Sequence, residues 1–193
     1  MSNSLIWRDR NGSWRYTMQS YTSMDYKTFI STPIYKVLTP LSCDDMLQYM
    51  DKHPDLYVAA DMKGEIKKSY IYLLNRAKNL GLINVLDRII VSCYTFEEYK
   101  EIMSVYPFKE KTIRQYINHP HNYYKLAEFC CKNDIPVVNI SYCYKDDEGL
   151  KVLTSKNIRV YIAVEDDCYK FKQHRKNGIY GCVSNYLNEN DNN

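Results

Sequence analysis

The fold of this chain follows from the stretch DLYVAADMKGE, which runs from Asp55 to Glu65. Five consecutive apolar residues, 56–60, follow a turn-forming Pro54-Asp55 pair and predict a buried strand. The strand ends in charge: Asp61 and Lys63 are two residues apart, so in an extended chain their side chains lie on the same face. In a barrel of parallel strands the carboxyl ends of the strands form the mouth of the active site, and this pair would face a common pocket there. The alternative is an ion pair that closes a strand before a turn.

Strands and helices alternate along the chain after this stretch. The apolar patterns predict buried strands at 87–94, 135–140, 158–164 and 179–183, a weaker strand at 112–117, and helices at 65–80, 96–106, 122–133, 146–156 and from Asp166 or Asp167 to Asn177. Apolar strands joined by helical crossovers indicate a parallel sheet covered by helices. Both an open doubly wound sheet and a (β/α) barrel fit this order. No glycine-rich phosphate-binding motif follows a strand, which argues against the open sheet.

The first 54 residues are less regular. A short strand is predicted at 4–7, and residues 16–39 form a long connection in which 23–25 cap a short helix. Ser42 is a good N-cap for a helix that stops near His53-Pro54.

The composition favours one globular domain spanning 1–193, with a frayed polar tail at 188–193. The net charge of +3 comes from scattered, mixed charges, which argues against a nucleic-acid partner. No apolar run is long enough to span a membrane, and no signal peptide is visible at the start, so we expect a cytoplasmic protein. Seven cysteines without a CxxC spacing agree with free thiols in a reducing compartment.

Several stretches resemble, in order, the glycerophosphodiester phosphodiesterase and phosphatidylinositol-specific phospholipase C-like family. Residues 57–63 resemble a family strand that ends in acid-x-Lys, 86–94 are similar to its fourth strand and 157–167 to its seventh. Residues 178–187 resemble the closing strand, with Ser184-Asn185 where the family usually has Thr-Asp. The resemblance implies an α/β fold of the (β/α) TIM-barrel type. The barrel would be incomplete, with about six βα units and the first one or two strands missing.

The resemblance also implies roles for individual residues. Asp61 would be a ligand of a divalent cation, Mg²⁺ or Ca²⁺, and Lys63 a catalytic charge that faces the phosphate. Arg8 stands at the position of a catalytic histidine; it stays protonated and therefore clamps a phosphate rather than shuttling a proton. Asp9 and Asp166 would contact the substrate, and Asp166 stands where the family tends to have Asn.

Two hypotheses follow for the function. The first is a metal-dependent phosphodiester hydrolase, impaired or inactive as the chain stands, because the other carboxylates and the histidines of the family have no counterpart here. The full gene product or a partner chain would then supply the missing strands and catalytic groups. The second is a non-catalytic relative that binds a phosphorylated head group or a sugar. An incomplete barrel leaves open sheet edges, which residues 2–21, a second copy or a partner chain would cover.

Overall fold

The computed structural model describes residues 7–8, 14–15, 25–33, 37–62, 65–115, 122–141 and 147–187. Its contacts divide the chain into two compact units, 1–54 and 55–193, which are described separately. The single domain predicted for 1–193 stays a prediction, and the predicted tail at 188–193 lies outside the described residues. Within the described part, no helix is long and apolar enough to cross a membrane.

In the described residues of the first unit there are two short strands and two helices. Its described elements are β1 (Trp7–Arg8), β2 (Trp14–Arg15), α1 (Tyr26–Ser31) and α2 (Cys43–Lys52), and β1 pairs with β2 in antiparallel orientation. Both helices begin at the predicted caps. Asp25 accepts a hydrogen bond from the backbone N–H of Thr28, and Ser42 forms a reciprocal capping box with Asp45. These side chains satisfy backbone N–H groups that a helix start otherwise leaves without a partner.

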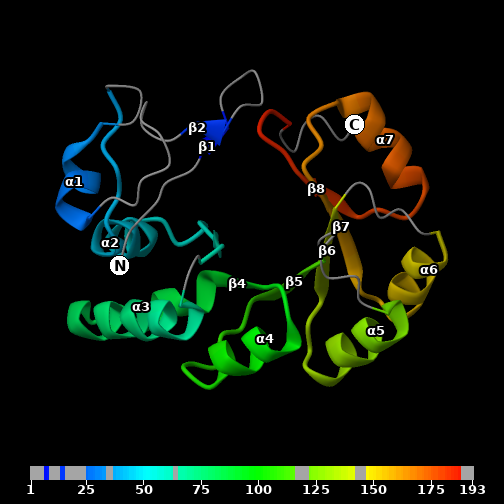
Figure 1. The fold of residues 1–193 in the computed structure, drawn as a ribbon, viewed down its shortest axis with the longest axis horizontal. Helices are drawn as coiled ribbons and strands as arrows, with labels where there is room; N and C mark the ends of the chain where they lie inside the picture. Colours follow the sequence, from blue (N-terminus) through cyan, green and yellow to red (C-terminus); the bar gives the residue numbers. More distant parts are fainter. Residues whose placement is uncertain are drawn as a thin grey trace. The chain divides into compact units, whose positions relative to one another are not determined.

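The second unit is built on one six-stranded parallel sheet, as the sequence predicts. The strands are β3 (Val58–Ala60), β4 (Ile89–Cys93), β5 (Lys111–Gln115), β6 (Val137–Ser141), β7 (Arg159–Ala163) and β8 (Gly181–Val183). They lie side by side in chain order, and every neighbouring pair is parallel. This order is that of an incomplete (β/α) barrel, and Figure 1 shows the sheet curving from β4 to β8. Cover of the sheet edges at β3 and β8 stays a prediction.

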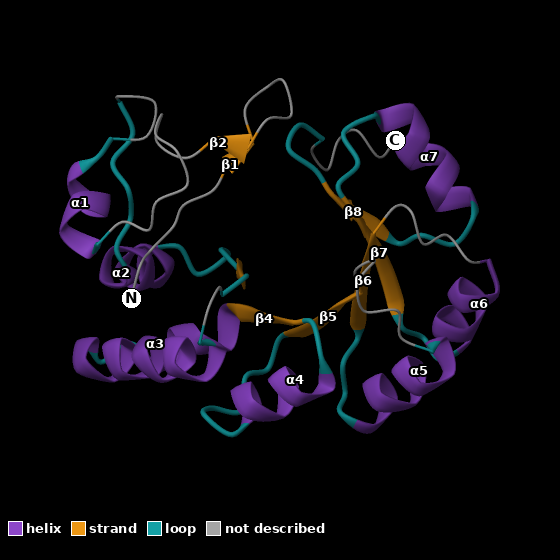
Figure 2. Cartoon of the chain, viewed as in Figure 1, coloured by secondary structure: helices purple, strands orange, loops and turns teal. Residues whose placement is uncertain are grey.

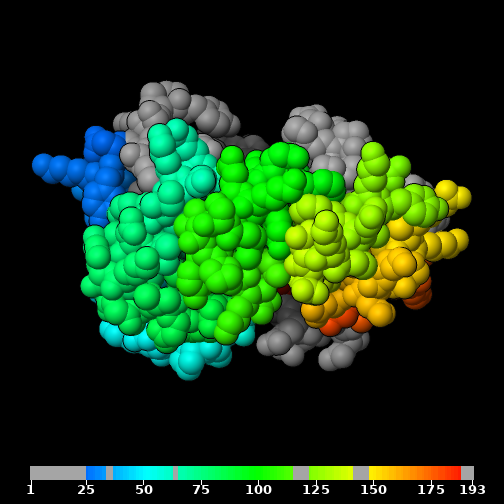
Figure 3. All heavy atoms as spheres, turned by 90° about the horizontal axis from the view of Figure 1, so that it is seen from below, coloured from blue at the N-terminus to red at the C-terminus, as the bar shows by residue number. Residues whose placement is uncertain are grey.

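Helices cover one face of this sheet. They are α3 (Ile66–Leu80), the 3-10 helix η1 (Ile83–Arg88), α4 (Phe96–Met103), α5 (Tyr123–Lys132), α6 (Asp147–Ser155) and α7 (Cys168–Lys176). Figure 2 shows the helices of this unit outside the strands, and Figure 3 shows their outer surface as a band from α3 to α6. Gly81 ends α3 with φ 72°, which a glycine adopts without strain. Helix α4 ends at Met103, earlier than the predicted end at 106. Pro107 disfavours helical backbone at Tyr106, which accounts for the last of these residues only.

The two faces of the sheet differ in chemistry. Buried apolar side chains alternate along the strands and form the core under the helices: Val91, Cys93, Ile113, Val138, Ile140, Val160 and Ile162. The opposite face, called the inner face here, carries polar side chains. Ser92 pairs in register with Thr112, and Arg114 pairs with Asn139, which pairs with Tyr161. The inner face of this sheet is therefore polar toward the strand ends, where the core of a closed barrel is usually apolar.

Gly181 on β8 lies on the inner face, next to Tyr161 on β7. It pairs in register with Tyr161, and a Cβ added at Gly181 would overlap the Tyr161 ring. Only a glycine leaves room for that ring. The closing strand therefore positions an aromatic side chain on the polar face.

Candidate functional site

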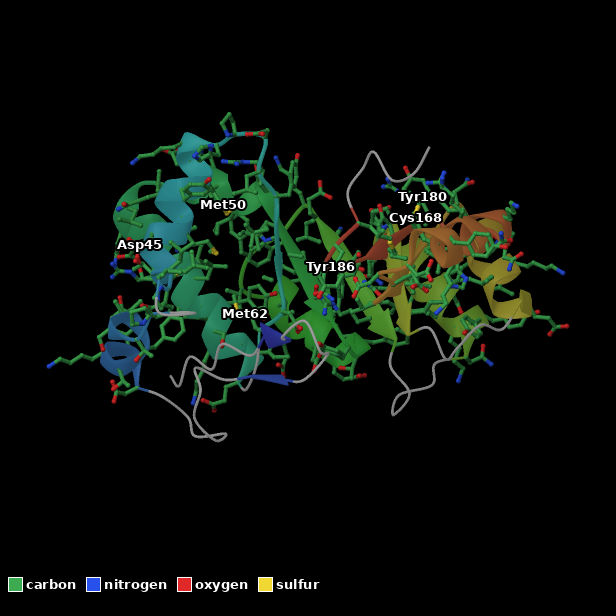
Figure 4. The ribbon with its side chains drawn as sticks, turned by 90° about the horizontal axis from the view of Figure 1, so that it is seen from above. Asp45, Met50, Met62, Cys168, Tyr180 and Tyr186 are labelled. Carbon is green, nitrogen blue, oxygen red and sulfur yellow. The ribbon has the colours of Figure 1, made fainter. Side chains whose placement is uncertain are left out.

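Asp61 lies at the carboxyl end of β3, as predicted, and receives hydrogen bonds from two neighbouring strands. The Tyr94 hydroxyl, directly after β4, donates to Asp61 Oδ1 at 2.7 Å. The Arg114 guanidinium, on β5, donates from Nη1 to Asp61 Oδ2 at 3.2 Å. Figure 4 labels Met62, the residue after Asp61, and so locates this end of the strand. The carboxylate thus ties together three adjacent strand ends.

The pair of Asp61 and Arg114 is mostly shielded from water. The Arg114 side chain is 17% exposed and the Asp61 side chain 31%. A charge held in such a place is costly without an opposite charge beside it, and each member of this pair supplies that charge to the other.

Tyr94 and Arg114 are site residues that the sequence reasoning missed. Arg114 carried only a weak signal: it lies inside the predicted weaker strand 112–117, and an arginine in a strand that becomes buried needs an acidic partner. The signal does not name that partner, since Asp61 is 53 residues away along the chain.

Two hydroxyl groups, of Ser92 and Thr112, lie on the inner face next to the cluster of Asp61, Tyr94 and Arg114. Ala60 pairs with Val91, so the next residues along the two strands, Asp61 and Ser92, are neighbours, and Ser92 pairs with Thr112. Ser92 is 4% exposed and Thr112 7%. Neither hydroxyl has a hydrogen-bond partner in the described part of the chain. A buried polar group without a partner destabilises the fold, so these two adjacent hydroxyls need a water molecule or another polar group beside them.

A second cluster ties the end of β7 to α7. Glu165 and His174 are both buried, and His174 Nε2 lies 3.3 Å from Glu165 Oε2. The other oxygen of Glu165 accepts a hydrogen bond from the backbone N–H of Asp167 at 3.0 Å. Asp167 in turn caps α7 by accepting from the N–H of Lys170. These contacts fix the loop between β7 and α7.

Asp166, predicted to contact the substrate, holds the closing segment 184–187. It accepts hydrogen bonds from Ser184 Oγ at 2.8 Å, from the Asn185 backbone N–H at 2.7 Å and from Asn185 Nδ2 at 3.0 Å. Figure 4 labels Tyr186, which lies in this segment. Both carboxylate oxygens of Asp166 are engaged within the protein, and its contact with a substrate stays a prediction.

The remaining predicted site residues lie outside what the structure describes. Asp9 and Lys63 are not described, and for Arg8 only the backbone position in β1 is. The predicted roles of these three residues therefore stay predictions.

Two cysteines close to this end of the sheet are not reactive thiolates. Burial, with a smaller contribution from Glu98, raises the pKa of Cys93 to about 12. Burial, followed by the carboxylates of Glu165 and Asp166, also raises the pKa of Cys182. Thiols with raised pKa values stay protonated at neutral pH and are poor nucleophiles.

The described residues do not fit the divalent cation that the family resemblance implies. No three His, Cys, Asp or Glu side chains among them come together as a metal-binding group. Both oxygens of Asp61 already accept hydrogen bonds, one of them from a cation. A divalent ion on Asp61 would lie about 5 Å from the guanidinium, where repulsion at an effective dielectric constant of about 20 amounts to ~7 kcal/mol. A hard cation also prefers several oxygen ligands.

Comparison with known proteins identifies the fold of the chain. Neither models of known protein families nor curated protein sequences match the chain. Among solved structures it is similar to a proposed glycerophosphodiester phosphodiesterase from Galdieria sulphuraria, with a TM-score of 0.71 and 15% identity over 94% of this chain and 80% of that one. It is also similar to a glycerophosphodiester phosphodiesterase from Parabacteroides distasonis, with a TM-score of 0.63 and 8% identity over 93% of this chain and 76% of that one. The chain therefore has the fold of the glycerophosphodiester phosphodiesterases, as the sequence resemblance implied.

Proposed function

We propose that this chain binds the phosphorylated head group of a small ester at the carboxyl ends of β3 to β6, and that it does not hydrolyse that ester with a bound metal ion. The observation that carries the proposal is the polar inner face. Ser92 and Thr112 bring two buried hydroxyls without partners next to the cluster of Asp61, Tyr94 and Arg114. Hydroxyls donate to phosphate oxygens and accept from the hydroxyls of an alcohol, so they suit both halves of such a ligand.

Ligand binding can be tested by calorimetry on the full chain. Glycerol 3-phosphate, inorganic phosphate and glycerol are titrated separately into the wild type and into the double variant Ser92→Ala, Thr112→Val. We expect glycerol 3-phosphate to bind the wild type, and the double variant to lose about tenfold or more in affinity, because each hydrogen bond contributes about 1 kcal/mol.

The matched control is Ser155→Ala, which removes an exposed hydroxyl on α6 that donates to the Val152 carbonyl. This variant should bind like the wild type. The proposal fails if none of the three compounds binds, or if the double variant and the control behave alike.

Hydrolysis is the second candidate, because the structurally similar proteins are named as phosphodiesterases. Its test is the release of nitrophenol from bis(p-nitrophenyl) phosphate with Mg²⁺ or Ca²⁺. We expect no turnover above that of buffer. Metal-dependent turnover that Asp61→Ala abolishes would establish the hydrolase and overturn the non-catalytic assignment.

A further inference from the structure

We infer that the Arg114 guanidinium is a resident cation of this site and excludes divalent ions from Asp61. The inference goes beyond the proposed function, since it concerns the cation and holds whichever ligand binds. It assigns to one residue of this chain the charge that a metal ion would otherwise supply at this end of the sheet.

The first support is geometric. The two oxygens of Asp61 are approached from two different strands, by the Tyr94 hydroxyl at 2.7 Å and by Arg114 Nη1 at 3.2 Å. A metal ion would have to displace one of these groups before it could coordinate the carboxylate. Displacing Arg114 would leave a guanidinium that is only 17% exposed beside the incoming ion.

The second support is the permanence of the charge. Arginine does not lose its proton in proteins, so the positive charge beside Asp61 persists at every working pH. A lysine or a histidine could release its proton and yield the place to a metal ion, whereas an arginine cannot.

The third support is that Glu98, an acidic residue near Tyr94, already accepts hydrogen bonds from the backbone. Glu98 Oε2 accepts hydrogen bonds from the backbone N–H groups of Tyr94 at 2.7 Å and Thr95 at 3.3 Å, and so belongs to the cap of α4. Among the described residues, Asp61 belongs to no group of three or more His, Cys, Asp or Glu side chains that could hold a metal ion.

Terbium luminescence tests the inference directly. A Tb³⁺ ion at Asp61 would lie beside the Tyr94 phenol, and excitation of that phenol would make the bound ion emit. The signal assigned to this site is the part that Asp61→Asn removes. We expect none in the wild type, and at least a tenfold gain in the variant Arg114→Glu, which replaces the cation with a second carboxylate. Mg²⁺ or Ca²⁺ should compete for the new site.

The matched control is Arg159→Glu, the same charge change at an exposed arginine on β7. It should gain no Asp61-dependent signal, which separates local exclusion from a change in net charge. An Asp61-dependent signal in the wild type would overturn the inference, and so would its absence in a folded Arg114→Glu chain. If Arg114→Glu does not fold, Ca²⁺ is titrated into the wild type while the NMR resonance of the Asp61 carboxyl carbon is followed. A saturable change in its chemical shift would refute the exclusion of divalent ions from Asp61. An unchanged chemical shift would support it.

Discussion

The ion pair of Asp61 and Arg114 makes the sharpest prediction about stability. The perturbation is a double-mutant cycle with Asp61→Asn and Arg114→Met, which remove each charge at nearly constant volume. The expected cost is intermediate, because the side chains are 31% and 17% exposed. Exposed pairs contribute about 0.2–1 kcal/mol, and breaking a fully buried pair costs about 3–5 kcal/mol. We therefore expect Arg114→Met to cost about 2 kcal/mol and the coupling energy to be about 1 kcal/mol.

Urea unfolding followed by circular dichroism measures both quantities, and the slope of the transition shows whether the unfolded state has changed. The control cycle uses Lys109 and Asp87, whose Nζ and Oδ2 atoms are 2.6 Å apart but whose lysine side chain is 67% exposed. Because the lysine end of that pair is exposed, its coupling energy should be smaller, about 0.5 kcal/mol or less. A coupling energy within error of zero for Asp61 and Arg114 would refute the reasoning from burial, and with it the view that Arg114 is fixed beside Asp61.

Three further predictions concern other parts of the chain. Gly181→Ala should destabilise the fold by about 1–3 kcal/mol in urea unfolding, because the new methyl group overlaps the tyrosine ring that covers this glycine; an unchanged midpoint would contradict this packing. Ser42→Ala should cost about 1 kcal/mol at pH 7. Hydrogen bonds from Ser42 lower the pKa of Asp45 in the folded chain. The stability that they contribute is therefore fully present above the ordinary carboxyl pKa and is lost as the pH falls through the lowered pKa. The cost of Ser42→Ala should shrink in acid, and a cost independent of pH would rule out this linkage. In the native chain at pH 8, iodoacetamide should alkylate the exposed Cys131 and leave the buried Cys93 unmodified, as read by peptide mass spectrometry; equal labelling of both would refute the burial of Cys93.

Local sequence patterns determined most of the second unit. The order of strands and helices could be predicted because apolar periodicity and capping residues act over only a few positions. Thr95, for example, begins α4 with a capping box, and Gly81 ends α3 in the left-handed region. The position of Asp61 at a strand end belongs to the same class, since a buried run followed by charge marks the end of a strand. Boundaries were less certain: β4 begins only at Ile89, because 83–88 form a 3-10 helix.

The chemistry around Asp61 was decided by the tertiary structure alone. The sequence supplied Lys63 as its expected companion, whereas the described contacts come from Tyr94 and Arg114, 33 and 53 residues further along. Strand pairing and register bring these groups together, and neither can be predicted from the local periodicity of the sequence. Asp166 shows the same limit: its sequence position suggested a ligand contact, and the fold directs both its oxygens to Ser184 and Asn185. The sequence by itself thus determined which elements form and where charge ends a strand, because those preferences are local; only the folded sheet decided which charges meet, because that depends on strands far apart in the chain lying side by side.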